Sequence, residues 1–443
     1  MKRIFNLVSL GCPKNLVDSE VVYGLLEEAG WQGVDDPEEA AVLIINTCGF
    51  IQPAVEESIE EILQLAAYKS KDPAKKLVVI GCLVQRYREK LEAELKEVDL
   101  FVGTEGVPQV AALLDSLVEG KQLDSLIIAD PFLMSSALPR RRSTPFYRAW
   151  LKITEGCDNH CSYCMIPSIR GRLRSRSEED LIQEASELAA AGVREVSLVA
   201  QDLTAYGTDL YGKRRLETLV TRLLDETSVD WIRLLYLYPS TVSPELLDII
   251  GGNSRVVPYL DIPLQHISSK ILKAMNRRYT REEVIGLVND IRIRIPDAAL
   301  RTTLLIGFPG ESEEDVREVE VFLREMELDH VGVFGYANEE GSAAEKFSRQ
   351  VEEEEKQARL ERIITLQAEI SQRRLKRFVN TVEPVLIEGV SRETDLLLEG
   401  RTRYQAPDID GCVLINEGDT RFGEIVDVEI TEAQTYDLIG RVV

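Results

Sequence analysis

The chain alternates short apolar segments with amphipathic segments of helical length through most of its first 375 residues. Strands that alternate with helices are joined by right-handed crossovers and pair in parallel, so the pattern predicts an α/β protein built on parallel sheets. In the first stretch each apolar segment precedes one helical segment. The apolar segments are 3–10, 41–46 and 76–81, and the helical segments are 15–30, 55–68 and 84–97.

A second and longer alternation follows a linker rich in Ser, Pro and Arg, 135–146. It contains six strand candidates, too few for a complete eight-unit barrel, so we expect an open, partial (βα)6 barrel. The strand candidates are 149–154, 193–200, 231–237, 256–262, 300–307 and 330–336. The clearest helical segments are 178–192, 313–327 and the long exit helix 351–378.

The last part of the chain changes to short apolar segments interrupted by Gly, Asp and Asn: 383–390, 411–418 and 422–430. This pattern predicts a small OB-like β-barrel. A chain of 443 residues is also too long for one hydrophobic core. We therefore predict three domains, 1–135, 147–375 and 379–443.

Three cysteines lie close together after the first strand candidate of the central domain. Cys157, Cys161 and Cys164, the barrel cysteines, form a C-x3-C-x2-C array. A structural zinc site takes four protein ligands, and His160 is an awkward fourth because it is adjacent to Cys161. Three thiolates on a tight loop instead suit a 4Fe-4S cluster with one iron open to another ligand.

Three further cysteines each follow a strand candidate of the first domain. Cys12, Cys48 and Cys82, the N-terminal cysteines, come directly after segments 3–10, 41–46 and 76–81. Because parallel strands present their carboxyl ends at one edge of a sheet, we expect these thiols to converge there. The alternative is three unrelated buried cysteines, since free Cys is often buried. Cys412 stands apart and is expected to be an ordinary strand residue.

Cysteine use and hydropathy indicate the compartment. Seven scattered cysteines do not resemble a secreted disulfide framework and suit a reducing cytosol. No apolar run approaches the ~18 residues that span a membrane. The N-terminus imitates a short export signal, but its apolar part, 4–10, is interrupted by Asn6. We expect a soluble, cytoplasmic protein with no membrane partner.

The cysteine arrays carry a resemblance to a known family. A C-x3-C-x2-C array with an aromatic residue, Tyr163, before its third cysteine resembles the signature of the radical S-adenosylmethionine (SAM) superfamily. With the three upstream cysteines in SLGCPKN, INTCGFI and IGCLVQRY, and a C-terminal β-domain that resembles TRAM, the whole chain resembles the methylthiotransferases. The segments SLGCPKN and LVAQDLTAYG look like the RimO type, the branch that modifies an aspartate of a small-subunit ribosomal protein.

The resemblance implies two 4Fe-4S clusters and SAM as cofactors. The barrel cysteines would hold a cluster whose open iron chelates SAM, and an electron from that cluster would cleave SAM to a 5′-deoxyadenosyl radical. The N-terminal cysteines would hold an auxiliary cluster whose open iron carries the sulfur to be inserted. A second SAM would donate the methyl group. The substrate carbon would then lie between the clusters, so the first domain should face the mouth of the barrel.

The resemblance also implies SAM contacts. Tyr163 would present its ring or backbone to the adenine, and a Gly-rich turn that begins at Gly307 would hold the nucleoside. The usual Gly-Gly-Glu motif after the second barrel strand is absent, and Gln201 and Asp202 occupy its place. Ser312 and Asp315, just beyond the turn, predict a helix capping box, so an ordinary strand-to-helix connection is the alternative reading. No catalytic residue is assigned beyond the two clusters.

Four alternating arginines follow the barrel cysteines. In an extended segment Arg170, Arg172, Arg174 and Arg176 would share one face. Such a face suits the SAM carboxylate or an acidic substrate group, whereas a solvated strand edge is the alternative. We expect one or two of the four to be functional.

The net charge of the chain and of its last domain indicates what kind of macromolecule the protein binds. The formal charge is −24, and residues 379–443 contain fourteen acidic and five basic residues. An RNA-binding surface should be basic, so the last domain favours a basic protein partner, as ribosomal protein S12 would be.

Three functions therefore remain. We favour an enzyme that forms 3-methylthioaspartate in ribosomal protein S12 with an external electron donor. The same chemistry on a tRNA adenosine is the second possibility and needs a basic path that the last domain does not offer. The third is a non-enzymatic iron–sulfur or zinc-binding adaptor. A merely structural site has no reason to leave a ligand position open, and this chain has two three-cysteine sites that do so.

Overall fold

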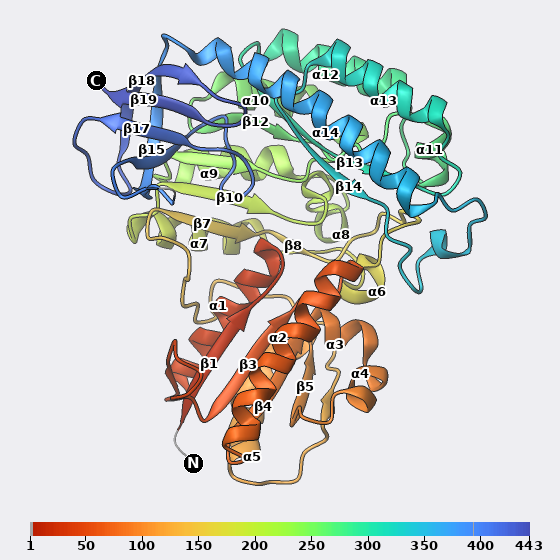
Figure 1. Ribbon diagram of the computed structural model, residues 1–443. Coiled ribbons are helices and arrows are strands. Elements are labelled where there is room, and N and C mark those ends of the chain that lie inside the picture. Colours follow the sequence, from red (N-terminus) through yellow and green to blue (C-terminus); the bar gives the residue numbers. More distant parts are fainter. Residues whose placement is uncertain (1–2, 393) are drawn as a thin grey trace.

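The computed structural model describes residues 3–392 and 394–443. Two six-stranded sheets and one closed β-barrel organise the chain, in that order along the sequence. Figure 1 shows the N-terminal sheet at the bottom, the second sheet with its helices in the middle, and the closed barrel beside the second sheet at the upper left. None of the helices in the described part of the chain is long and apolar enough to cross a membrane.

The N-terminal sheet is parallel throughout, in the order β2-β1-β3-β4-β5-β6. The three predicted strands are confirmed. The sequence reading missed β5 and the two-residue edge strands. The strands are β1 (Ile4–Ser9), β2 (Gln32–Gly33), β3 (Val42–Thr47), β4 (Lys76–Gly81), β5 (Leu100–Gly103) and β6 (Leu126–Ile127).

The helices of this domain cover both faces of its sheet, which explains why the central strands β3 and β5 are buried along their whole length. The third predicted helix is in fact two short ones, because Arg88 has a positive φ of 45° and interrupts the run. The helices are α1 (Pro13–Glu28), α2 (Gln52–Lys71), α3 (Cys82–Tyr87), α4 (Glu89–Glu94), the 3-10 turn η1 (Thr104–Gln109) and α5 (Val110–Val118).

The second sheet is the predicted open barrel, with the order β14-β13-β12-β11-β10-β7 and parallel pairing at every step. A two-stranded antiparallel ribbon, β8 and β9, follows its first strand. The strands are β7 (Arg148–Lys152), β8 (Thr154–Glu155), β9 (Arg174–Ser175), β10 (Glu195–Val199), β11 (Trp231–Leu234), β12 (Val256–Asp261), β13 (Ala299–Ile306) and β14 (His330–Gly335).

Helices and short 3-10 turns connect these strands, and several helices begin at strong N-caps. Thr280 and Ser312 each form a capping box, with Glu283 and Asp315 respectively, so the predicted Ser312–Asp315 box is confirmed. The elements are α6 (Ile166–Arg170), α7 (Glu178–Ala190), η2 (Leu203–Ala205), α8 (Thr208–Tyr211), α9 (Leu216–Glu226), η3 (Pro239–Thr241), α10 (Pro244–Gly252), α11 (Ser269–Ala274), α12 (Arg281–Arg294), α13 (Glu313–Met326), η4 (Ala343–Lys346), α14 (Glu353–Leu375) and η5 (Lys376–Phe378).

The C-terminal strands form the predicted small barrel, closed in the order β15-β16-β17-β19-β18. They are β15 (Val382–Val390), β16 (Leu398–Thr402), β17 (Val413–Glu417), β18 (Ile425–Ala433) and β19 (Leu438–Val442). This barrel packs at the starting ends of the strands of the open barrel. Glu195, the first residue of β10, is fully buried and bonds Arg401 of the small barrel at 2.6 Å, and Tyr259 of β12 donates to Asp410 at 2.6 Å. The opposite, carboxyl ends of these strands are left for the cysteine loops.

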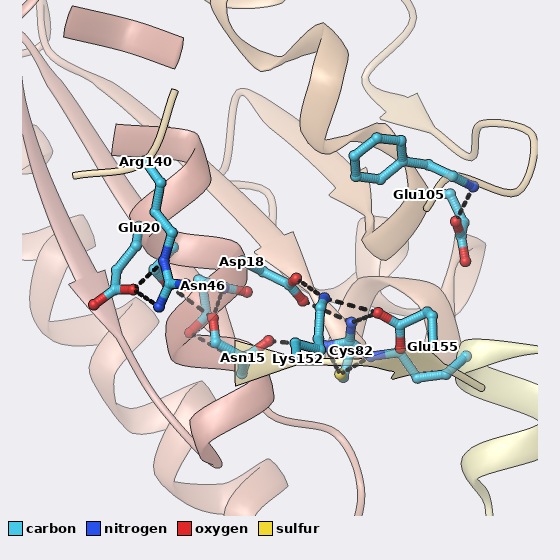
Figure 2. Close-up of polar contacts among 12 residues, drawn as sticks. Asn15, Asp18, Glu20, Asn46, Cys82, Glu105, Arg140, Lys152 and Glu155 are labelled. Atoms are coloured by element: carbon cyan, nitrogen blue, oxygen red, sulfur yellow. Dashed lines mark hydrogen bonds and ion pairs between the residues drawn. The ribbon is translucent and has the colours of Figure 1, made fainter. Parts of the chain in front are cut away.

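Buried polar contacts join the N-terminal domain to the open barrel. The linker residue Arg140 pairs with Glu20 of α1 at 2.6 Å (Figure 2). It also pairs with Glu184 of α7 at 2.6 Å. Both carboxylates are nearly fully buried, so the linker is fixed between the two domains.

Candidate active site

One cavity of about 360 Å³ brings the two cysteine sets together, at the carboxyl ends of strands from both sheets. All six predicted cysteines line it, with Tyr163, Gln201 and Asp202. Cys412 lies instead just before β17 in the small barrel. The cavity is therefore shared by two domains that lie far apart in the sequence.

The N-terminal cysteines converge as the parallel topology predicted. Cys12 lies at the N-cap of α1, Cys48 directly follows β3, and Cys82 opens α3 after β4. The backbone at Gly11 lies so close to Cys48 that a Cβ at Gly11, whose φ is +90°, would lie 2.8 Å from the Cys48 Cβ. Only glycine fits there. Burial raises the pKa of the Cys48 thiol and raises that of Cys82 to about 12.

The barrel cysteines lie on the loop between β8 and α6. Backbone N–H groups point at two of the sulfurs, since Asn159 N donates to Cys157 Sγ and Ile166 N to Cys164 Sγ, each at 3.4 Å. The guanidinium of Arg277 lies 3.7 Å from the third, Cys161 Sγ. Burial raises the pKa of Cys157 to about 11 and that of Cys164 to about 12. These donors would stabilise thiolates that bind metal.

The four alternating arginines do not share a face, so that expectation was wrong. α6 ends at Arg170, and Gly171, with a φ of +72°, turns the chain out of the extended conformation. Arg172 projects into solvent, Arg174 pairs with Glu105 of the N-terminal domain, and Arg176 is buried against Asp180 and Glu184 of α7. Of the four, Arg170 lines the cavity.

Arg170 joins the two domains beside a cysteine. Its Nε and Nη2 donate to Cys82 Sγ at 3.3 and 3.1 Å, and its Nη1 donates to Asp18 at 2.6 Å. Figure 2 shows Asp18, Lys152 and Glu155 directed toward one another beside Cys82. The side chains of Lys152 and Arg170 are 3% and 4% exposed, so two buried cations balance two buried carboxylates.

The same network fixes the charge of Glu155. Burial opposes its ionisation, but Lys152 and Arg170 outweigh burial and lower its pKa to about 2. The carboxylate is therefore charged at neutral pH and holds both cations in place.

The predicted SAM residues have different surroundings. The Oε1 atom of Gln201 is buried and has no hydrogen-bond partner in the described part of the chain, which leaves an acceptor for a polar ligand. Asp202 accepts from Asn159 of the barrel-cysteine loop at 2.7 Å and from Thr204 at 2.6 Å, so it holds this loop to the end of β10. Tyr163 faces the cavity.

Gly307 is not among the residues that line the cavity. Its N–H donates to Glu311 at 2.9 Å, its φ is +82°, and a Cβ there would lie 2.5 Å from Lys356. The turn after β13 therefore requires glycine for its own packing.

Lys14, Tyr236 and Arg277 are among the cavity residues that were not singled out in the sequence. Lys14 was part of the SLGCPKN segment and lies two residues after Cys12, which was a usable signal. Tyr236 and Arg277 reach the cavity from the loops after β11 and α11 and carry no local motif.

The donor set fits an iron–sulfur cluster better than a single metal ion. Within residues 3–392 and 394–443, no three His, Cys, Asp or Glu side chains are grouped closely enough for one ion. In a 4Fe-4S cluster each thiolate binds a different iron, so three thiolates surround the cluster rather than one point. The unpartnered Gln201 oxygen beside them suits a polar cofactor such as SAM.

Three parts of the chain match known families. Residues 4–103 match the uncharacterized protein family UPF0004, residues 151–323 match the radical SAM superfamily, and residues 380–443 match the TRAM domain.

Proteins described as ribosomal protein uS12 methylthiotransferase RimO are similar to the whole chain. The one from Desulfotalea psychrophila is 57% identical over 439 residues, covering 99% of each chain. Those from Geotalea uraniireducens and Geobacter sulfurreducens are each 47% identical over 444 residues, 100% of this chain and 99% of theirs. The chain belongs to the RimO family. The family resemblance found in the motifs is confirmed, and this RimO-family protein is a radical SAM methylthiotransferase that uses an iron–sulfur cluster and SAM.

Solved structures agree in fold with this RimO-family protein. The radical SAM methyltransferase TsrM from Kitasatospora setae has a TM-score of 0.55 at 17% identity, covering 76% of this chain and 75% of its own. The cobalamin-dependent radical SAM enzyme OxsB has a TM-score of 0.52 at 11% identity, covering 78% of this chain and 54% of its own. At these identities the likeness concerns the fold alone.

Proposed function

We propose that this protein inserts sulfur and a methyl group at the β-carbon of an aspartate in ribosomal protein S12, forming 3-methylthioaspartate. The observation that carries the proposal is the meeting of two three-cysteine sets, from two domains, in one cavity. The full-length relatives described as ribosomal protein uS12 methylthiotransferase RimO support this reaction and this substrate.

Two 4Fe-4S clusters are part of the proposal. The barrel cysteines would hold one and the N-terminal cysteines the other, and each cluster would keep one iron without a protein ligand. When bound, the barrel cluster would supply the electron that cleaves SAM, and the open iron of the auxiliary cluster would carry the sulfur to be inserted. The chain's own residues position these groups: Arg170 bridges the domains beside Cys82, and Asp202 fixes the barrel-cysteine loop through Asn159.

The SAM contacts are proposed on the same basis. Gln201 would hydrogen-bond the methionine part of SAM, because its buried Oε1 has no partner among the described residues. Asp202 and Tyr163 line the same cavity. Gly307 would contribute indirectly, by allowing the turn after β13 to adopt its conformation.

A basic protein remains the proposed partner, with an external electron donor and with tRNA as the less favoured substrate. Arg401, one of the five basic residues of the C-terminal domain, is buried between Glu195 and Glu388. The excess of acidic over basic residues in this domain disfavours a phosphate backbone as its partner.

The test is an anaerobic assay of reduced, reconstituted protein with SAM, read by mass spectrometry. The substrates are a peptide spanning the aspartate-containing loop of the ribosomal protein and, separately, unmodified tRNA. A methylthio group on the peptide's aspartate is the expected result. The same group on tRNA alone would contradict the proposed substrate while leaving the chemistry intact.

A further inference from the structure

A buried lysine from the N-terminal domain extends into the cavity. Lys14, the second residue of α1, is 7% exposed and lines the cavity two residues after Cys12. Its Nζ donates to the carbonyl of Ala200, just past β10, at 3.1 Å. The same atom lies 4.3 Å from the centre of the Tyr236 ring, which follows β11. The ammonium thus lies at the interface between the two domains.

Lys14 has no acidic partner. Among residues 3–392 and 394–443 its polar contacts are one carbonyl and one aromatic face, and it forms no ion pair. An ammonium has three donors, so two remain for a ligand. Burying an unpaired charge costs free energy, and a carboxylate that enters the cavity would recover it.

Two other charged groups of the cavity, Arg170 and Asp202, already have polar partners. Arg170 is balanced by Asp18 and Glu155. The carboxylate of Asp202 accepts from Asn159 and Thr204. Arg170 is therefore not free to receive a further anion, and the polar contacts of Asp202 are to Asn159 and Thr204 rather than to Lys14.

One other cation of the cavity also has no carboxylate partner among the described residues. Arg277 lies 3.7 Å from Cys161 Sγ and donates to the carbonyl of Pro263 and to the hydroxyl of Tyr279. It is therefore on the side of the barrel cysteines, where SAM with its own carboxylate is proposed to bind. Lys14 comes from the N-terminal domain, and its ammonium lies where the two domains meet, so it is the cation that remains for the substrate.

We propose that Lys14 binds the side-chain carboxylate of the target aspartate and selects an acidic residue over an uncharged one. The inference rests on the proposed function and names the group that determines its specificity. A charge-assisted hydrogen bond from Nζ would hold the carboxylate, and the β-carbon next to it would then lie between the two cysteine sets. A neutral carboxamide cannot compensate the ammonium.

The experiment measures peptide binding to the reconstituted protein. One peptide carries the target aspartate and the other carries asparagine in its place, and both are titrated against wild type and Lys14→Met. Wild type should prefer the aspartate peptide by about 10- to 100-fold, the range of a buried charge-assisted hydrogen bond. Lys14→Met should bind both peptides with similar Kd values. Lys14→Gln, which keeps a hydrogen-bond donor but no charge, should give the same loss and provides a second neutral variant if Met perturbs folding.

Lys75→Met is the matched control. Lys75 is also 7% exposed and also donates only to backbone carbonyls, those of Pro37, Glu38 and Ala40, but it does not line the cavity. It should keep the full aspartate preference. Iron content and the visible absorption of the clusters are measured in parallel, so that a lost cluster is not taken for a lost contact.

The outcomes separate the inference from the proposed function. If wild type forms the methylthio product and the neutral variants keep the aspartate preference, the inference is overturned and the function stands. If the neutral variants instead bind SAM more weakly but keep the wild-type ratio of the two peptide Kd values, Lys14 binds SAM rather than the substrate. The inference is then again overturned. If wild type modifies only tRNA, the proposed function fails and the inference fails with it.

Discussion

The buried ion-pair network beside Cys82 gives a stability prediction that can be worked from the structure. Arg170→Met removes a guanidinium that bonds Asp18 at 2.6 Å and Glu155 at 3.3 Å. Two buried carboxylates would then share the single ammonium of Lys152. Removing one partner of a buried ion pair costs about 3–5 kcal/mol, so the free energy of unfolding should fall by that amount.

The matched control lies two residues away. The side chain of Arg172 is 90% exposed, and it contacts Asp158 at 3.4 Å. An exposed ion pair of this kind contributes less than about 1 kcal/mol, so Arg172→Met should be nearly neutral. Urea unfolding followed by circular dichroism, at one pH and salt concentration, compares the two variants. The first transition is used, since a chain of several domains need not unfold in one step.

A second substitution tests the cause. Asp18→Asn in the Arg170→Met background leaves Lys152 paired with Glu155 alone and restores the charge balance. The double variant should regain about 1–3 kcal/mol relative to Arg170→Met. The reasoning is refuted if Arg170→Met unfolds within about 1 kcal/mol of Arg172→Met, or if the second substitution destabilises the protein further.

Two further predictions concern the small barrel and the N-terminal cysteines. Burial opposes the ionisation of Glu195, but Arg233 and Arg401 outweigh it and lower its pKa to about 2. Because the folded-state pKa is depressed, this stabilisation is full above the unfolded pKa and is lost as the pH falls toward 2. It amounts to about 3 kcal/mol. Unfolding midpoints measured down to about pH 3 should therefore fall more steeply in wild type than in Glu195→Gln, and equal slopes would contradict the assignment. Gly11→Ala forces a Cβ to 2.8 Å from the Cys48 Cβ and should remove about half of the bound iron. Cys412→Ser should leave iron unchanged, and an equal loss from both variants would show that neither effect is local.

Strand periodicity, and the position of residues relative to strand ends, made much of the fold and of the cysteine sites predictable from the sequence. The convergence of the N-terminal cysteines needed only a parallel sheet, because such a sheet places the carboxyl ends of its strands at one edge. The open barrel was predicted from six apolar segments that alternate with helical segments. These features are encoded locally and can be recognised without knowledge of tertiary contacts.

The features that the sequence did not predict depend on contacts between distant segments. The arginines from Arg170 to Arg176 diverge because a short helix and Gly171 interrupt the extended segment, and their partners lie on other elements. Lys14 is an ordinary helix residue in the sequence, and only the packing of α1 against the open barrel gives it a place in the cavity. The small barrel packs at the starting ends of the strands, away from the cysteines. No local pattern encodes that arrangement.

The measurement that tests the central claim most directly is iron and sulfide per chain in anaerobically reconstituted protein. Wild type is compared with two variants, one with the barrel cysteines and one with the N-terminal cysteines replaced by alanine. Two clusters predict about eight irons with equal sulfide in wild type and about four in each variant. Iron that disappears completely from either variant, or zinc without sulfide in wild type, would contradict two separate clusters facing one cavity.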